Sequence, residues 1–140
     1  MPAPIRHLVL DSEAVSALLS PRRNDPKRRE VIRALMAANG RRAVPTAVRV
    51  EARWDRRDER AADANRLFPR GTDIGLDGTL ADRAAELRAA VPKASPVDAS
   101  VAAVAEHVGA SGGVVEILTS DVPLTALAAQ LSATTDVTKL

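Results

Sequence analysis

Apolar and polar positions alternate along the chain in two ways, which together predict short strands separated by helices. Short apolar runs bounded by turn residues are typical of buried strands. Such runs cover residues 8–10, 43–44, 72–76 and 114–118, and residues 136–140 form a possible edge strand. Apolar residues at a spacing of three and four predict helices that begin near Ser12, Lys27, Thr46, Asp77, Pro96 and Asp121. A charged helix is expected within residues 55–70.

The order of these elements predicts the fold class. Strands that alternate with helices are connected by parallel crossovers. We therefore expect an α/β fold, a three-layer sandwich around a short, mostly parallel central sheet. The chain has 140 residues, without an internal repeat or a low-complexity linker, and we expect residues 1–140 to form a single domain.

The composition excludes several classes of function. Trp54 and Phe68 are the only aromatic residues, so there is no set of rings on which bases could stack. Cysteine is absent, which excludes thiolate metal sites and cysteine nucleophiles and fits a cytoplasmic location. No apolar run reaches the roughly 20 residues of a membrane span, and the N-terminal residues do not resemble a signal peptide.

The charge is unevenly distributed although the net charge is only +2. Residues 1–70 contain 16 Lys and Arg against 9 Asp and Glu, and residues 71–140 contain 4 against 9. A basic half could neutralise nucleic-acid phosphates. The candidates for RNA binding include Arg22, Arg23, Arg41 and Arg42. A preference for Arg and Ala is also typical of GC-rich genomes, so the basic half does not by itself establish a binding surface.

Four acidic residues are placed to meet at one edge of the predicted sheet. Asp11 and Asp121 directly follow strands, and Glu51 and Asp98 lie in the first two turns of helices that begin at the same edge. The carboxyl ends of parallel strands form the crevice where α/β sheets bind ligands. Simpler roles are also open: Asp11 as a helix N-cap, Asp98 as a first-turn acid, and Glu51 in a salt bridge with a nearby Arg.

Four carboxylates in a small crevice raise one another's pKa unless a cation neutralises them. Mg²⁺, or Mn²⁺, is suitable because it prefers oxygen ligands. Such a metal site could hydrolyse phosphodiester bonds without a conventional general base. The chain offers few alternatives, because its two histidines lie at the start of a strand (His7) and near the end of a helix (His107).

Four motifs in order resemble the PIN domain family, in particular the VapC-type toxins of toxin–antitoxin pairs. The apolar strand followed by Asp11-Ser12 is similar to the family's opening motif. Glu51 stands where the family has its glutamate, in the segment 44–51, and Asp98 near the start of the helix 95–103. The family's last motif, Thr-x-Asp after a strand, is matched by Thr119-Ser120-Asp121.

The resemblance implies a Mg²⁺- or Mn²⁺-dependent endoribonuclease that cleaves RNA, is inhibited by an antitoxin protein and forms a homodimer. It implies that the metal-binding and catalytic residues are Asp11, Glu51, Asp98 and Asp121, supported by the hydroxyl residues Ser12, Thr119 and Ser120. Two positions depart from the family: Glu13 replaces a small polar residue, and Leu124 replaces a further Asp.

Other classes of protein remain possible from the sequence. The missing acid at Leu124 leaves open a non-catalytic PIN-like module that binds RNA or protein. A receiver-type phosphoacceptor domain needs an acceptor Asp after its third strand, where this chain has Gly75-Leu76. Haloacid-dehalogenase-type phosphatases need Asp-x-Asp at the opening motif, where this chain has Asp11-Ser12-Glu13.

Overall fold

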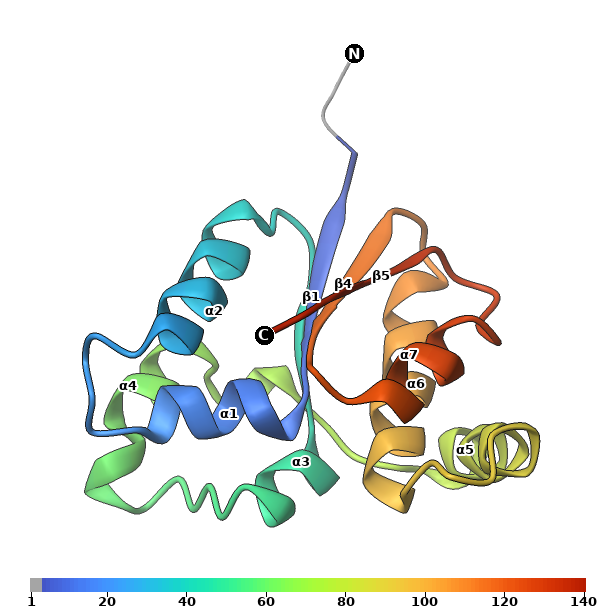
Figure 1. Ribbon diagram of the computed structural model, residues 1–140, viewed down its shortest axis with the longest axis horizontal. Helices are drawn as coiled ribbons and strands as arrows, with labels where there is room; N and C mark the ends of the chain where they lie inside the picture. Colours follow the sequence, from blue (N-terminus) through green and yellow to red (C-terminus); the bar gives the residue numbers. More distant parts are fainter. Residues whose placement is uncertain (1–3) are drawn as a thin grey trace.

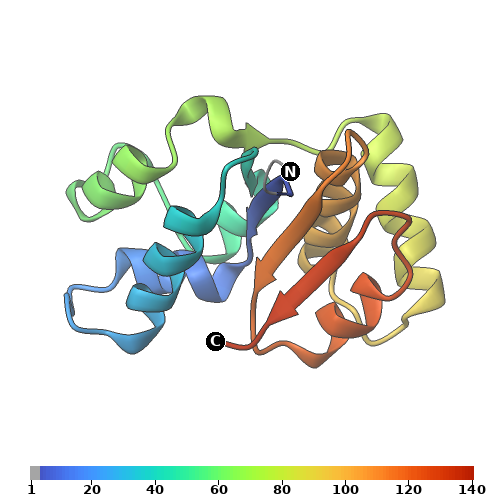
Figure 2. The ribbon, with the colours of Figure 1, turned by 90° about the horizontal axis from the view of Figure 1, so that it is seen from above.

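The computed structural model describes residues 4–140, and their centre is a five-stranded sheet in which all strands are parallel (Figures 1 and 2). The spatial order is β3-β2-β1-β4-β5. The strands are β1 (Arg6–Leu10), β2 (Arg42–Pro45), β3 (Asp73–Ile74), β4 (Val114–Leu118) and β5 (Thr135–Thr138). The predicted α/β fold with a parallel sheet is therefore confirmed.

Helices cover both faces of the sheet. Figure 1 shows α1, α2 and α4 on one side of the strands and α6, α7 and α5 on the other, with α3 near the lower end. Their bounds are α1 (Ser12–Leu19), α2 (Pro26–Ala37), α3 (Thr46–Glu51), α4 (Ala62–Leu67), α5 (Gly78–Ala90), α6 (Pro96–Gly109) and α7 (Val122–Ala128). Two short 3₁₀ turns, η1 (Glu59–Ala61) and η2 (Arg70–Thr72), flank α4. No helix of the described residues is long and apolar enough to cross a membrane.

The strand order brings the ends of β1 and β4 together. β1 pairs with β2 on one side and with β4 on the other, and Leu10 lies opposite Leu118. The chain therefore leaves β1 and β4 at the same level, and Asp11 and Thr119 are the first residues beyond this edge. An edge at which the connections diverge to opposite sides of the sheet is the usual ligand crevice of such folds.

Small aliphatic residues build the core. The strands contribute fully buried Leu, Val and Ile side chains, and α6 is buried on nearly all sides because α5, α7 and the sheet surround it. Its inward residues are mostly Ala and Val, which allow close approach of neighbouring elements. Each fully buried Leu or Val contributes about 1.5–3 kcal/mol relative to an exposed one. The core therefore holds the carboxyl ends of β1 and β4 rigidly.

The sequence interpretation was wrong about the face of α3. The spacing of Ala47, Val50, Glu51 and Trp54, at i, i+3, i+4 and i+7, predicts one inner face of a helix, but the helix ends at Glu51. The N–H of Trp54 then bonds to the carbonyl of Arg49 at 2.8 Å, and the N–H of Arg53 to that of Val50 at 3.2 Å. This pattern is a Schellman motif, which reverses the chain at a helix end. Trp54 is consequently buried, whereas Val50 and Glu51 are exposed.

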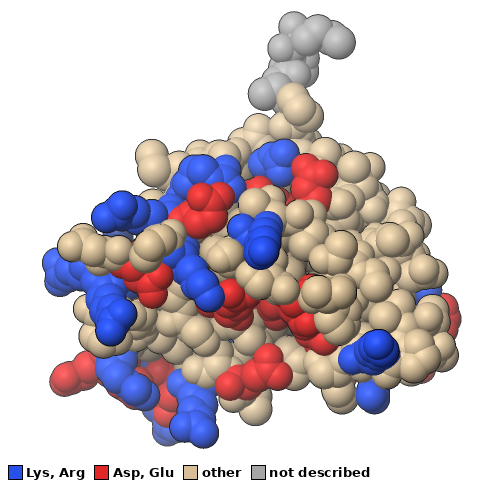
Figure 3. Space-filling model, viewed as in Figure 1, with Lys and Arg blue, Asp and Glu red and all other residues tan. Residues whose placement is uncertain are grey.

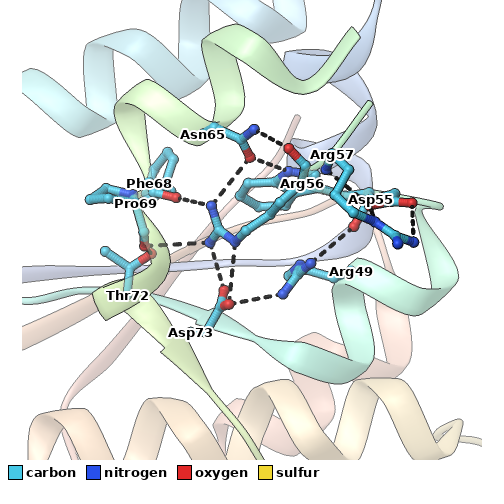
Figure 4. Close-up of polar contacts among 10 residues, drawn as sticks. Arg49, Asp55, Arg56, Arg57, Asn65, Phe68, Pro69, Thr72 and Asp73 are labelled. Atoms are coloured by element: carbon cyan, nitrogen blue, oxygen red, sulfur yellow. Dashed lines mark hydrogen bonds and ion pairs between the residues drawn. The ribbon is translucent and has the colours of Figure 1, made fainter. Parts of the chain in front are cut away.

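A buried arginine holds the segment that follows α3. Arg56 is buried and donates to both carboxylate oxygens of Asp73, at 2.7 and 3.3 Å (Figure 4). It also donates to the carbonyl of Phe68 at 2.7 Å, and its guanidinium carbon lies 4.5 Å from the centre of the Trp54 ring. Arg49 donates to the same Asp73 at 2.8 Å. We call these five residues the Arg56 cluster; they connect α3, the turn after it and β3.

Candidate active site

Asp11 is the centre of the candidate site. It is buried directly after β1, and the hydroxyl of Thr119 donates to its Oδ2 at 2.6 Å. Asp11 occupies the N-cap position of α1, but its side chain makes no capping hydrogen bond. Burial raises the pKa of its carboxyl, and the charges of Asp98 and Glu51 add to this effect. The simple capping role weighed from the sequence is thus not the one that the side chain adopts.

The loop after β4 brings Asp121 beside the other acids. The N–H of Asp121 donates to the hydroxyl of Thr119 at 3.0 Å, so Thr119 links Asp11 to Asp121. The pKa of Asp121 is raised to about 7, first by a side-chain hydrogen bond with Asp98, then by burial and by the charges of Asp98, Asp11 and Glu51. Carboxylates affect one another in this way only when they are close together.

Asp98 has two neighbours of different kinds. With Ser95 it forms a capping box at the start of α6: each side chain accepts from the other's N–H, at 3.0 and 3.1 Å. The capping role considered from the sequence is therefore real. The carboxyl of Asp98 also faces Asp121, whose pKa it raises more than any other group does. The cap fixes the position of Asp98 and leaves it able to act at the crevice.

Glu51 approaches the crevice from the end of α3. It accepts a hydrogen bond from the hydroxyl of Ser12, the residue after Asp11. The alternative of a salt bridge between Glu51 and an arginine does not occur within residues 4–140. Ser12 therefore ties the opening motif to the glutamate in the same way that Thr119 ties it to Asp121.

No cationic side chain pairs with any of these four acids in residues 4–140. We call Asp11, Glu51, Asp98 and Asp121 the acid cluster. Their partners are hydroxyl and backbone N–H groups and one another. In the space-filling view, acidic side chains gather in the lower middle of the molecule, while Lys and Arg lie mainly over α1, α2 and α4 (Figure 3). The crevice therefore carries uncompensated negative charge.

The comparisons with known proteins agree with this geometry. A family model described as PIN domain matches residues 8–130. The chain belongs to the PIN domain family. A solved structure titled "Structure of FitAB bound to IR36 DNA fragment" is similar, with a TM-score of 0.60, 16% identity, and coverage of 93% of this chain and 94% of that chain. At 16% sequence identity, this similarity shows a shared fold and nothing further. A search of curated proteins found no match.

The donors of this PIN domain fit a hard divalent cation chemically, although they are not arranged around one. PIN domains typically use divalent metal ions. Within residues 4–140, no three His, Cys, Asp or Glu side chains form a group that could hold a metal ion as they are placed. All four donors of the acid cluster are nevertheless carboxylates, the ligands that Mg²⁺ and Mn²⁺ prefer. The raised pKa of Asp121 is a repulsion that a cation would relieve.

Two positions at which this PIN domain departs from its family now have a structural explanation. Glu13 accepts from the ammonium of Lys27 at 2.7 Å and from the N–H of Ser120 at 2.8 Å. Its pKa is lowered, because the bonds from Lys27 and Ser120 outweigh the effect of burial. Glu13 thus connects α1, α2 and the loop after β4. Leu124 is fully buried in the core, so no acid takes the place of the missing Asp there.

The four arginines predicted to bind RNA do not lie together. Arg41 and Arg42 stand at the amino end of β2, the opposite end of the parallel strands from Asp11. Arg42 also donates to the carbonyl of Leu67 at 3.4 Å. Arg22 and Arg23 lie in the loop between α1 and α2 and are exposed. A continuous basic wall beside the acids is therefore not formed by this set.

Sequence reasoning missed contacts that only the folded chain reveals. The links from Thr119 to Asp11 and from Ser12 to Glu51 were expected only as general support for the acids. Ser120 was expected to support them too, but its N–H bonds to Glu13 instead. The Arg56 cluster had a weak signal in the sequence: an arginine two residues after the only tryptophan.

Proposed function

We propose that this PIN domain is a metal-dependent endoribonuclease and the toxin of a toxin–antitoxin pair, with the acid cluster as its metal-binding and catalytic residues. PIN domains are generally nucleases, which supports hydrolase activity. The observation that carries the proposal is the acid cluster itself: four close carboxylates without a cationic side chain beside them in residues 4–140. Close like charges lower the stability of the fold until a bound cation neutralises them, so their presence together supports a cation site.

Asp11, Glu51, Asp98 and Asp121 would hold Mg²⁺ or Mn²⁺. The bound ion would supply an activated water and neutralise the charge that develops on the phosphate. The chain's own residues orient the ligands: Thr119 fixes Asp11, Ser12 fixes Glu51, and the capping box fixes Asp98. Without a cation, the hydrogen bond with Asp98 and burial raise the pKa of Asp121 to about 7, so a proton on Asp121 must leave when an ion binds.

RNA as the substrate, an antitoxin partner and a homodimer are supported by the resemblance of the four motifs to VapC-type toxins. The similar structure, FitAB bound to a DNA fragment, associates this fold with nucleic acid and supports a nucleic-acid ligand for this chain. An antitoxin that covers the acid cluster would block the site from the same side as the RNA enters.

The decisive experiment compares cleavage of single-stranded RNA by the wild type, Asp11→Asn and Glu13→Gln in Mn²⁺. Asp11→Asn keeps the size of the side chain but removes the charge, and it should lower kcat/KM at least about a hundredfold. Glu13→Gln is the matched control on the same helix, because its amide oxygen can still accept from Ser120. It should keep most of the activity.

Full metal-dependent cleavage by Asp11→Asn would exclude the proposed site. Absence of both cleavage and Mn²⁺ binding in the wild type would instead favour the non-catalytic RNA- or protein-binding module, which the buried Leu124 keeps open. Co-expression with a neighbouring antitoxin frame tests the biological part: growth arrest should occur without that frame and be relieved with it.

A further inference from the structure

A polar groove runs along α1 beside the acid cluster. It has a volume of about 260 Å³, and its polar lining residues are Ser16, Ser20, Arg53, Asp55, Asp58 and Arg60. Ser12, Ser16 and Ser20 are four residues apart, so they lie on one face of the helix. Ser12 bonds to Glu51 at the near end of this face. The groove therefore begins one helical turn beyond the acid cluster.

Arg53 lies in this groove in a backbone conformation that arginine rarely adopts. It has φ 58° and is the only non-glycine residue of the described chain with a positive φ. The Schellman motif after α3 imposes this conformation, and glycine is the residue that usually fills such a position. An arginine kept in a strained position favours a role for its side chain.

Arg53 also differs from its neighbours because its charge is free. Within residues 4–140 its side chain makes no ion pair or hydrogen bond. Arg57 pairs with Asp55 at 3.1 Å, and Arg60 pairs with Asp58 at 2.8 Å. These pairs lower the pKa of both carboxyls and neutralise the two acids that line the groove. The uncompensated charge in the groove is therefore the guanidinium of Arg53.

We propose that this groove binds the RNA strand next to the cleaved bond, with Arg53 contacting a backbone phosphate. The inference rests on the proposed ribonuclease function and deepens it. A free guanidinium suits a phosphate, and serine hydroxyls can bond to phosphate or ribose oxygens without reading a base. The groove starts beside the acid cluster, so a strand whose phosphate lies among the acids continues naturally into it. The negative acids bind the ion, and Arg53 holds the flanking phosphate that they would otherwise repel.

The test measures the affinity of the full chain for a short, labelled, single-stranded oligoribonucleotide in EDTA, where no cleavage occurs. Arg53→Gly should weaken binding about five- to tenfold and reduce the slope of log K against log salt by about 0.7, the value for one phosphate contact on a single strand. It should also raise the Tm by about 2–4 °C, because glycine adopts this φ without strain. Arg53→Lys should retain most of the affinity.

Arg57→Gln is the matched control, because Arg57 belongs to the same turn but is paired with Asp55 and does not line the groove. It should bind the oligoribonucleotide as the wild type does. In Mn²⁺, Arg53→Gly should raise KM while leaving kcat nearly unchanged.

The outcomes separate this inference from the proposed function. If the wild type cleaves RNA and Arg53→Gly binds it equally well, the groove inference alone fails. It fails too if Arg53→Gly loses affinity for an antitoxin protein but not for RNA, or if Arg57→Gln weakens RNA binding as much. If the wild type binds RNA through Arg53 but does not cleave it, the nuclease proposal fails, and of the groove inference only the contact between Arg53 and an RNA phosphate stands. A wild type that binds no RNA contradicts both.

Discussion

Two polar clusters each include one residue of α3, and they differ in whether their charges are paired with charges of the opposite sign. The Arg56 cluster places Asp73 between two guanidinium groups and gives Arg56 carbonyl acceptors and an aromatic face as well (Figure 4). The acid cluster gathers charges of one sign and offers them only hydroxyl and N–H donors. In the first arrangement the acid is paired with cations, and only Nε of Arg49 lacks a partner among the described residues, whereas in the second no cation is present.

The difference indicates which cluster serves stability and which serves function. Removing one partner of a buried ion pair leaves an uncompensated charge and is strongly destabilising. Close carboxylates without a cation lower the stability of the fold, so they are retained for what they bind. Glu51 and Arg49 are two residues apart on α3, yet each belongs to a different cluster. The Arg56 cluster thus anchors the helix that presents Glu51 to the crevice.

The largest expected effect follows from breaking the Arg56 cluster. Arg56→Met keeps an extended side chain beside Trp54 but removes the charge and every donor. It leaves the carbonyl of Phe68 and part of Asp73 buried without partners. We expect the free energy of unfolding to fall by about 3–4 kcal/mol. Urea denaturation of the metal-free protein measures this.

Arg57→Gln is the control for that change, because the pair of Arg57 with Asp55 lies in the same turn but is exposed. Its urea midpoint should match the wild type, since exposed ion pairs contribute little. If Arg56→Met lost less than about 1 kcal/mol, the Arg56 cluster would not be the anchor of this segment.

Binding of a metal ion to the acid cluster should have the next largest effect on stability. Mn²⁺ at a hundred times its Kd should raise the free energy of unfolding by about 2.7 kcal/mol, and EDTA should reverse the change. Arg56→Met should show the same metal-dependent gain from its lower starting point, because the two clusters act separately. Asp11→Asn should show almost none. A gain of equal size in Asp11→Asn would place the ion elsewhere.

The sequence was sufficient for the fold and for bringing the acids together, because both follow from local patterns. The apolar runs of β1 and β4 and the acids after them could be located directly, and parallel pairing places the ends of strands at one edge. Helix starts at Ser12, Pro96 and Val122 carry recognisable signals, such as the Ser95–Asp98 capping box. These features depend on neighbours within a few residues.

The rest depended on contacts between distant segments or on one backbone angle. The end of α3 could not be predicted because Arg53 occupies a left-handed position that glycine usually marks. The predicted helix therefore ran too far and put Val50 and Glu51 on the buried face with Trp54, and the Arg56 cluster was missed. Similarly, Glu13 could not be placed because its partners, Lys27 and Ser120, come from two other segments. Charge in a sequence does not reveal which arginines are already paired.

The smallest effect is expected from Asp121→Asn in the absence of metal. This change tests directly whether the acids of the acid cluster repel one another. The pKa of Asp121 is about 7 in the folded protein against an ordinary value of 3.8, so its neutral form is favoured by folding. The stability that this provides is fully present below about pH 4 and is lost as the pH rises through 7. Asparagine stays neutral at every pH. The free energy of unfolding of the variant should therefore rise relative to that of the wild type between about pH 4 and pH 7, and the variant should be more stable above pH 7. Because Asp121 is partly exposed, we expect only about 1 kcal/mol, or a Tm higher by about 2–4 °C.

Thermal unfolding at pH 4.5 and pH 8 in EDTA measures the difference, which should be small at the lower pH. Arg57→Gln, at a residue that pairs with Asp55 and with none of the four acids, should show no such pH dependence. A variant less stable than the wild type at pH 8 would mean that Asp121 is held by favourable contacts, and the contrast between the two clusters would then fail.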